Sequence, residues 1–261
     1  MTNIVFNRER KRQQLDRAAK TFARSDFLYN ESASRIAGQF DDIIKKRFDK
    51  ALELGSRNNF LSKILIKNKI TQEVIRTSHS SGFLENNNIQ VNEELLPFKD
   101  ESFDLIVSNL ALHWVNDLPG CLVQIRRILK KGGFFCANLF GSRTLVELRN
   151  AFLIAEEEKG ISPRISPFIE VKDGAALLQR AKFDEPVSVS EEIFVKYQKL
   201  DDLMKDLRNM GETNALERLN NKYVGRDFFN RVEKIYKEKF SDASGNLDAT
   251  FELITISGWK K

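Results

Sequence analysis

Cysteine and histidine are both scarce in this chain. Its 261 residues include only two cysteines, Cys121 and Cys136, and two histidines. Two cysteines provide neither a disulfide framework nor the ligand spacing of a metal site, so the sequence favours a reducing compartment. No metal is therefore expected.

Long apolar runs and internal repeats are missing as well. No apolar stretch approaches the roughly 20 residues that a membrane-spanning helix needs, so no transmembrane segment is expected. A peripheral membrane contact is compatible with this. A hydrophobic content of 41% and a charged content of 30% are ordinary for a globular protein. The length fits one large domain, or a domain with an added lobe.

Neither sign of charge dominates the composition. The chain has 42 lysines and arginines against 37 acidic residues, a net charge of +5. This permits an anionic partner without requiring one, and no nucleic acid is expected. The densest basic run is FNRERKRQQLDRAAKTFAR. It fits a solvated amphipathic helix, a contact with phosphate or an acidic protein, or a targeting sequence; Glu9 and Asp16 weigh against the last, because transit peptides contain few acids.

The chain does contain a regular alternation of strand and helix patterns. The opening segment is predicted to be helical to about residue 48, with a break near Asp26. Strands are predicted in KALEL, EVIRTS, SFDLIVSNLAL and FFCANLF, and helices in FLSKILIK and DLPGCLVQIRRILKKGG. In the second helix, Lys130 and Lys131 suit the C-terminal dipole and Gly132 is the predicted end. This alternation predicts an α/β fold with a doubly wound, mostly parallel sheet.

The pattern loosens after Gly141. Helices are predicted in SRTLVELRNAFLIAEEEKG, VKDGAALLQRA, LDDLMKDLRNMG and GRDFFNRVEKIYKEKF, and strands in PVSVSEEIFVKY and ATFELITISGWK. We expect an N-terminal helical segment (1–47), a core (48–141) and a C-terminal lobe (142–261) that also supplies the last strands. The final strand should lie inside the sheet. Residues from about 160 to 245 should form a helical lid over its carboxyl edge.

Five stretches carry a resemblance to a known family: VFNRERKRQQLDRAA, NEELLPFKDESFDLIVSNLALHWVNDLPG, ISPFIEVKDGAALLQRA, MGETNAL and ATFELITISGWK. From about residue 4 to residue 259, the chain resembles type 11, class I methyltransferase-fold proteins. It is most similar to the methyltransferase-like assembly factors of respiratory complex I in alphaproteobacteria and mitochondria. Malonyl-carrier-protein methyltransferases of biotin synthesis are a further relation.

The resemblance implies a Rossmann-like, seven-stranded methyltransferase fold that binds S-adenosylmethionine across the carboxyl ends of the strands. It also implies a protein substrate or assembly partner, such as an iron–sulfur subunit of complex I. The expected location is the cytoplasm of a bacterium, since the match begins almost at Met1, or the mitochondrial matrix in a eukaryote.

The implied cofactor loop departs from the family pattern. The family has an acid and three alternating glycines after the first strand. Here Glu53, Gly55 and Ser56 keep the start of that pattern, while Arg57 and Asn59 stand at the second and third glycines. The Arg57 side chain is expected to enter the space of the cofactor's methionine portion. The alternative is that its guanidinium pairs with the cofactor's carboxylate.

The ribose and adenine positions also differ from the family. Ser78 and His79 stand where the family has a ribose-binding acid, and the nearest acid downstream is Glu85. Asn92, followed by Glu93, replaces the acid that reads the adenine amino group, although its carbonyl can still accept that hydrogen bond. We therefore expect S-adenosylmethionine to bind weakly or not at all, with no carboxylate at the ribose position.

Further residues implied by the resemblance are Asn109, beside the methionine portion, and an apolar wall formed by Leu95, Leu96 and Phe98. Core packing is the alternative for the wall. No catalytic residue follows from the motifs. The weak candidates are His113 and Trp114, with His113 either a general base or a hydrogen-bonded core histidine.

Three functions remain open on the sequence. The chain could be a working S-adenosylmethionine-dependent methyltransferase, an assembly factor that hydroxylates arginine on a complex I subunit, or a non-catalytic descendant that keeps the fold and its protein contacts. The resemblance favours the second function, and the altered cofactor loop supports the third.

Overall fold

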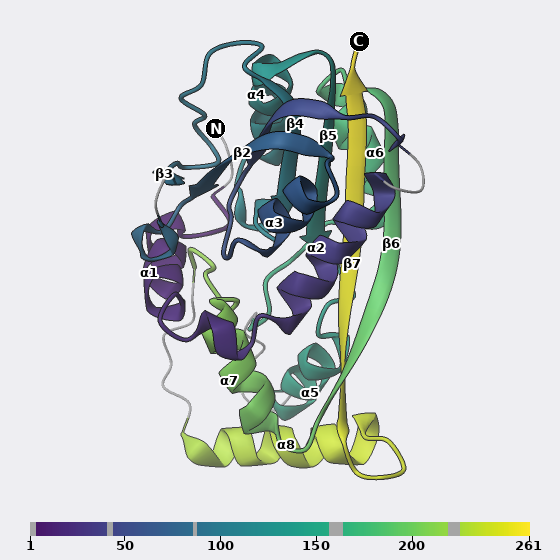
Figure 1. Cartoon of the computed structure of the whole chain (residues 1–261). Helices are drawn as coiled ribbons and strands as arrows, with labels where there is room; N and C mark the ends of the chain where they lie inside the picture. The colour runs from purple at the N-terminus through teal and green to yellow at the C-terminus, as the bar shows by residue number, and fades with distance from the viewer. Residues whose placement is uncertain (1–3, 41–43, 86–87, 157–163, 219–224) are drawn as a thin grey trace.

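A seven-stranded mixed sheet forms the centre of the computed structural model, which describes residues 4–40, 44–85, 88–156, 164–218 and 225–261 (Figure 1). The strand order is β3-β2-β1-β4-β5-β7-β6. The first five strands are parallel, and β7 runs antiparallel to both of its neighbours. The strands are β1 (Phe48–Glu53), β2 (Thr71–Ser78), β3 (Asn88–Gln90), β4 (Phe103–Asn109), β5 (Leu129–Phe140), β6 (Asp184–Tyr197) and β7 (Leu247–Lys260).

Helices cover both faces of this sheet. On one face, α2 (Phe27–Gln39) and α3 (Phe60–Lys67) pack with β1 and β4 around a buried cluster that includes Ile36, Leu65 and Val107. On the other face, α4 (Leu118–Ile128) and α6 (Val171–Arg180) pack around Leu122, Ile256 and their neighbours. Covering on both faces explains why the central strands are continuous apolar runs.

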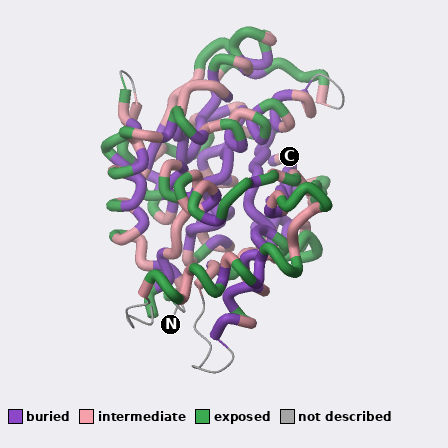
Figure 2. The backbone as a smooth tube through the Cα atoms, turned by 90° about the horizontal axis from the view of Figure 1, so that it is seen from below, coloured by how far each residue is buried: buried purple, intermediate pink, exposed green. Residues whose placement is uncertain are grey.

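A third group of helices gathers at the carboxyl edge of the parallel strands. It comprises α1 (Arg8–Ala18), α5 (Val146–Glu156), α7 (Leu200–Met210) and α8 (Arg226–Phe240). Three short 3₁₀ turns accompany them, η1 (Phe22–Arg24), η3 (Ser81–Phe83) and η4 (Leu112–Trp114). Their apolar faces share one buried cluster with the ends of β5 and β7. Seen from below, buried segments lie inside and exposed segments lie at the periphery (Figure 2). Among these described helices, none is long and apolar enough to cross a membrane.

The prediction that the final strand lies inside the sheet is confirmed. β7 pairs with β5 along Gly133–Phe140 and with β6 over nearly its whole length. Its residues are buried on both faces except near its ends. A strand buried on both faces cannot form the edge of a sheet without leaving apolar side chains in water.

The predicted end of the helix in DLPGCLVQIRRILKKGG was wrong. α4 ends at Ile128, and β5 begins at the next residue, so Lys130 and Lys131 belong to a strand. The reason is tertiary: Leu129 pairs with Phe103 of β4, and the Nζ of Lys130 lies 3.0 Å from Oδ1 of Asp104. Gly132 still adopts a positive φ of 73°, but within the strand.

Two further predictions need correction. The opening helical segment does not reach residue 48, because α2 ends at Gln39 and residues 45–47 are not helical. The predicted lid, from about residue 160 to 245, is helical at the carboxyl edge only in part: α7 and α8 lie there, whereas β6 joins the sheet and α6 covers its face. Residues 157–163 and 219–224, part of the predicted lid and its approach, lie outside the described residues.

Candidate functional site

The predicted site residues converge at the carboxyl edge of the sheet. Because β1, β2 and β4 are parallel, the residues that end these strands meet at one edge. The structure brings together Glu53, Gly55, Ser56, Arg57, Ser78, Asn109, His113 and Trp114, and it adds Asn92 and Glu93 after β3. Of the predicted apolar wall, Leu96 is buried, whereas Leu95 is 72% exposed and cannot line a site in this arrangement.

The loop after β1 keeps the turn of a cofactor loop. Gly55 has a φ of +77°, and its amide donates to Oγ1 of Thr77 at 3.4 Å. A Cβ atom added to Gly55 would lie 2.3 Å from the Cβ of Ala111, in the loop after β4. Glycine is required here both by the backbone conformation and by this close approach.

Glu53, the acid before this glycine, is buried without full pairing. Its side chain is 2% exposed, and its Oε2 has no hydrogen-bond partner among the described residues. The nearest cation is the Nε of Arg76, at 4.0 Å. Burial raises the pKa of Glu53 to about 7, because the charged form is poorly solvated there.

Arg57 points into the protein rather than into solvent. Its side chain is 4% exposed, and its guanidinium lies over the Phe83 ring, 5.7 Å from the centroid. One guanidinium nitrogen is 4.0 Å from Oε1 of Glu212, while its Nε has no partner in the described parts of the chain. A cavity of about 200 Å³ lies beside Arg57 and Phe83.

Glu212, which the sequence did not single out as a site residue, accepts hydrogen bonds from three elements. Its Oε2 accepts from Nε1 of Trp114 at 2.7 Å and lies 3.1 Å from Nε2 of His113. Its Oε1 accepts from the Tyr29 hydroxyl at 2.9 Å. The Glu212 side chain is only 4% exposed, so these contacts replace water around the carboxylate.

The charges around Glu212 are strongly coupled. The Nζ of Lys11 donates to its Oε1 at 3.0 Å and to the carbonyl oxygen of Gly211 at 2.7 Å. Burial alone would raise the pKa of Glu212, but Lys11, His113 and Arg57 outweigh it and hold that pKa well below its ordinary value. Burial lowers the pKa of Lys11 to about 7, although Glu212 opposes the change.

His113 is completely buried and forms part of an aromatic cluster. Its ring lies 4.8 Å from the Phe140 centroid and 5.3 Å from that of Phe168. Burial lowers its pKa, with Glu212 acting in the opposite direction. Its Nδ1 has no partner among the residues described. This placement favours the hydrogen-bonded core histidine over a general base.

The side-chain oxygens of Asn92 and Glu93, expected near the adenine amino group, already bond to Arg8 of α1. Arg8 forms an ion pair with Glu93, whose side chain is 5% exposed. The same guanidinium donates to Oδ1 of Asn92 at 3.3 Å and to the carbonyl oxygen of Trp114 at 3.1 Å. Asn92 also accepts from the amide of Glu94. Arg8 therefore joins the loops that follow β3 and β4.

Asn109 is likewise committed within the fold. Its Oδ1 accepts from the Ser32 hydroxyl at 2.7 Å, and its Nδ2 donates to the carbonyl oxygen of Tyr29 at 2.9 Å. Both partners belong to α2. The side chain expected beside the methionine portion thus anchors a helix to the end of β4.

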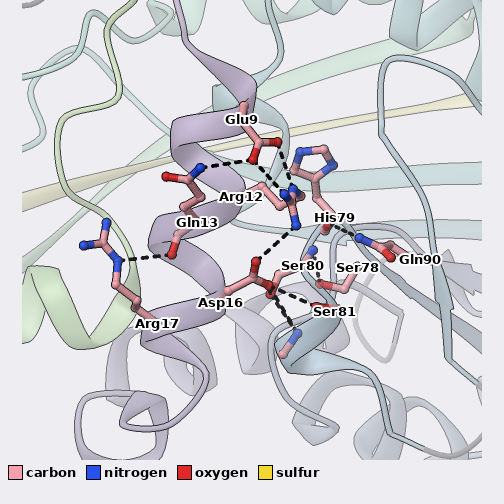
Figure 3. Close-up of polar contacts among 11 residues, drawn as sticks. Glu9, Arg12, Gln13, Asp16, Arg17, Ser78, His79, Ser80, Ser81 and Gln90 are labelled. Atoms are coloured by element: carbon pink, nitrogen blue, oxygen red, sulfur yellow. Dashed lines mark hydrogen bonds and ion pairs between the residues drawn. The ribbon is translucent and has the colours of Figure 1, made fainter.

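A carboxylate does reach the end of β2, but from a distant part of the chain. Ser78 is buried, and its hydroxyl accepts from the amide of Ser80 at 3.3 Å. The Ser80 hydroxyl donates to Oδ1 of Asp16 at 2.6 Å, and Asp16 turns from α1 toward this loop (Figure 3). The sequence predicted no acid here. That prediction considered only the residues next to Ser78 in the sequence, whereas Asp16 comes from the N-terminal helix.

A larger cavity opens next to Glu212, between η4, the end of β5 and helices α5, α7 and α8. It measures about 360 Å³, and its wall includes six aromatic side chains: Trp114, Phe140, Phe152, Phe168, Phe229 and Phe251. Glu212 and Trp114 lie between this cavity and the buried cations of Lys11 and Arg57. Phe168 and Glu212 belong to ISPFIEVKDGAALLQRA and MGETNAL, two of the stretches that carry the family resemblance. That resemblance was the sequence feature that could have indicated these wall residues.

The sheet order and the site at its carboxyl edge define a methyltransferase-fold protein. Residues 52–137 match the methyltransferase domain family. The YcgJ protein of Bacillus subtilis has a similar structure, with a TM-score of 0.59 at 15% identity, covering 88% of this chain and 98% of that one.

Sequence comparison gives the family more closely. Arginine-hydroxylase NDUFAF5 of Mus musculus is 38% identical over 98% of this chain and 77% of its own length, and the Homo sapiens protein gives the same values. Malonyl-(acyl-carrier protein) O-methyltransferase of Xylella fastidiosa is 29% identical over 98% of this chain and 89% of its own length. The chain belongs to the family of arginine-hydroxylase NDUFAF5, whose fold is that of the S-adenosylmethionine-dependent methyltransferases.

Proposed function

We propose that this chain acts on a protein substrate during the assembly of respiratory complex I, with an iron–sulfur subunit as partner and arginine hydroxylation as the reaction. The observation that carries the proposal is the 38% identity to arginine-hydroxylase NDUFAF5 over 98% of the chain. The buried Glu212 cluster at the carboxyl edge of the sheet supports a reaction at that edge. The cytoplasm of a bacterium is the proposed location, or the matrix if the source is a eukaryote.

S-adenosylmethionine does not fit the described residues as they are arranged. Arg8 already bonds to the side chains of Asn92 and Glu93, and Ser32 of α2 bonds to Asn109. The loop after β1 packs directly on Ala111. The cavity beside Arg57 measures about 200 Å³, below the roughly 300 Å³ at which ligand pockets begin. We infer that the cofactor binds weakly or not at all, and we assign no reaction step to it.

The second candidate is a non-catalytic assembly factor, and Arg57 is the observation that favours it. A buried arginine within the former glycine loop joins the Glu212 cluster, 4.0 Å from its carboxylate. A loop whose arginine contacts a buried carboxylate of the protein stabilises the fold and does not bind a ligand through that arginine. In this alternative the protein keeps its partner contacts and modifies nothing.

Mass spectrometry of complex I subunits separates these functions. The subunits are compared between cells that lack this chain and cells in which it is restored. Hydroxylation adds one oxygen atom to an arginine, methyl transfer adds one CH₂ unit, and a non-catalytic factor changes assembly alone. We expect the added oxygen, and its absence despite restored assembly would contradict the proposed reaction.

A matched pair of variants tests whether the site described here is responsible. Glu212→Gln removes the charge that organises Lys11, Tyr29 and Trp114. Glu217→Gln removes an exposed charge from the same segment. We expect the first variant to lose most of the modification per molecule of folded protein, and the second to keep it.

A further inference from the structure

The cavity beside Glu212 is large enough for a ligand and mainly apolar. Its 360 Å³ is more than twice the roughly 150 Å³ of an apolar cavity that binds benzene. Besides the six aromatic side chains, Leu145, Leu148, Met204 and Leu207 contribute to its wall. A ring with a short substituent would bury its surface against these side chains, and apolar burial contributes about 25 cal/mol per Å².

Three polar side chains of the wall, Glu212, Thr144 and Arg164, are already bonded within the protein. Glu212 holds Trp114 and His113. The Thr144 hydroxyl donates to the carbonyl oxygen of Glu252 and accepts from its amide. Arg164 pairs with Glu156. The charged side chains among the described residues of this wall already have partners, so a charged ligand would lack a counter-ion there, and burying an unpaired charge is strongly unfavourable.

Ser166 is a polar residue of this wall that lacks such a bond in the described part of the chain. It is 3% exposed, it lines the cavity, and its Oγ has no hydrogen-bond partner among the described residues. A buried hydroxyl left unpaired costs about 1–3 kcal/mol. A ligand atom that can donate or accept one hydrogen bond would remove this cost.

We propose that this cavity binds an uncharged, ring-containing group that carries one hydrogen-bonding atom, and that this atom pairs with Ser166. The ring packs against the aromatic wall, and a hydroxyl or N–H at its rim reaches the serine. The group can belong to a free small molecule or to an aromatic side chain of a protein partner. This assignment does not depend on the proposed function.

Calorimetric titration with four probes tests the assignment on the full-length protein. The probes are 4-ethylphenol, ethylbenzene, ethylguanidinium and N-acetyltyrosinamide. We expect 4-ethylphenol to bind about tenfold more tightly than ethylbenzene, since one hydrogen bond is worth about 1.4 kcal/mol. Ser166→Ala should remove that advantage without weakening ethylbenzene. Binding of N-acetyltyrosinamide would point to a partner's side chain, and binding of the free phenol alone would point to a small molecule.

Two matched variants locate the binding site. Leu148 of α5 lines the cavity, so Leu148→Trp should fill it and abolish phenol binding. Leu153→Trp places the same residue at a position of the same helix that is 38% exposed, and it should leave binding unchanged. Unfolding midpoints equal to that of the wild type would show that neither change acts through the fold.

Three results would overturn the proposal. The first is absence of binding by both 4-ethylphenol and N-acetyltyrosinamide. The second is a phenol affinity that does not respond to Ser166→Ala or to Leu148→Trp. The third is tighter binding of ethylguanidinium than of the phenol, which would make the cavity a site for a cation and leave the proposed arginine chemistry intact.

Discussion

The Nζ of Lys11 lies 3.0 Å from Oε1 of Glu212, although 201 positions separate the two residues. Lys11 also lies over the Trp114 ring, 3.7 Å from its centroid. This contact joins the N-terminal helix to the segment after α7 and to the loop after β4. These three segments are therefore held together by buried contacts at the carboxyl edge of the sheet.

Removal of the Glu212 charge should destabilise the fold. In Glu212→Gln, Lys11 and Arg57 stay buried without their carboxylate, and loss of one partner from a buried pair costs about 3–5 kcal/mol. Urea unfolding measures the loss. The control Glu217→Gln removes an exposed carboxylate nearby and should change the free energy of unfolding by less than about 0.5 kcal/mol. Similar values for both variants would show that the cluster contributes little.

Two of the arginines of α1, Arg8 and Arg12, should contribute unequally to the stability of the fold. Arg8→Ala leaves Glu93 buried without its cation and should cost about 2–4 kcal/mol. Arg12→Ala removes a 34% exposed side chain that pairs with Glu9 and Asp16 (Figure 3), and it should change the free energy of unfolding much less, because solvent screens exposed pairs. Hydrogen exchange of α1 should speed up in the first variant alone. Equal exchange in both would argue against Arg8 as the anchor.

Glu53 should weaken the folded state as pH rises. Its folded pKa of about 7 lies above the ordinary value of 4.5, so the unfolded chain loses this proton first. Between about pH 4.5 and 7 the wild type therefore loses stability relative to Glu53→Gln, and the difference is constant above pH 7. One pKa unit corresponds to about 1.36 kcal/mol, so the total change is at most about 3 kcal/mol.

Urea midpoints measured from pH 4 to pH 8 check the Glu53 prediction. The control is Glu73→Gln, which removes a 59% exposed carboxylate from the neighbouring strand. Its difference from the wild type should change little over the same range. A Glu53→Gln difference that is flat across this range would contradict the prediction.

Cofactor affinity should respond to two positions together. Calorimetry should detect weak binding or none for S-adenosylmethionine in the unmodified chain. Arg57→Gly alone should restore little, because Ser78 supplies no charged acceptor for the ribose. Arg57→Gly combined with Ser78→Asp should gain more than either change alone, since hydrogen bonds to a charged group contribute about 1.5–3 kcal/mol each. Micromolar binding by the unmodified chain would show that Arg57 does not obstruct the cofactor.

The sequence determined the elements and the edge at which the site forms. Strand and helix patterns have local periods, so KALEL, FLSKILIK and SFDLIVSNLAL were assigned correctly without tertiary information. Parallel strands bring their carboxyl ends together, and this placed Glu53, Arg57 and Asn109 at one edge. The position of the final strand inside the sheet followed from the strand–helix alternation and the resemblance.

Only the tertiary structure decided which side chains meet at that edge. No local sequence pattern marks the charged residues that meet there, because their partners lie tens to hundreds of positions away in the chain. These residues are Glu212, Lys11, Arg8 and Asp16. The end of α4 was decided in the same way, by the pairing of Leu129 with Phe103. Burial makes these charges pair, and burial is a property of the packed chain rather than of any segment of it.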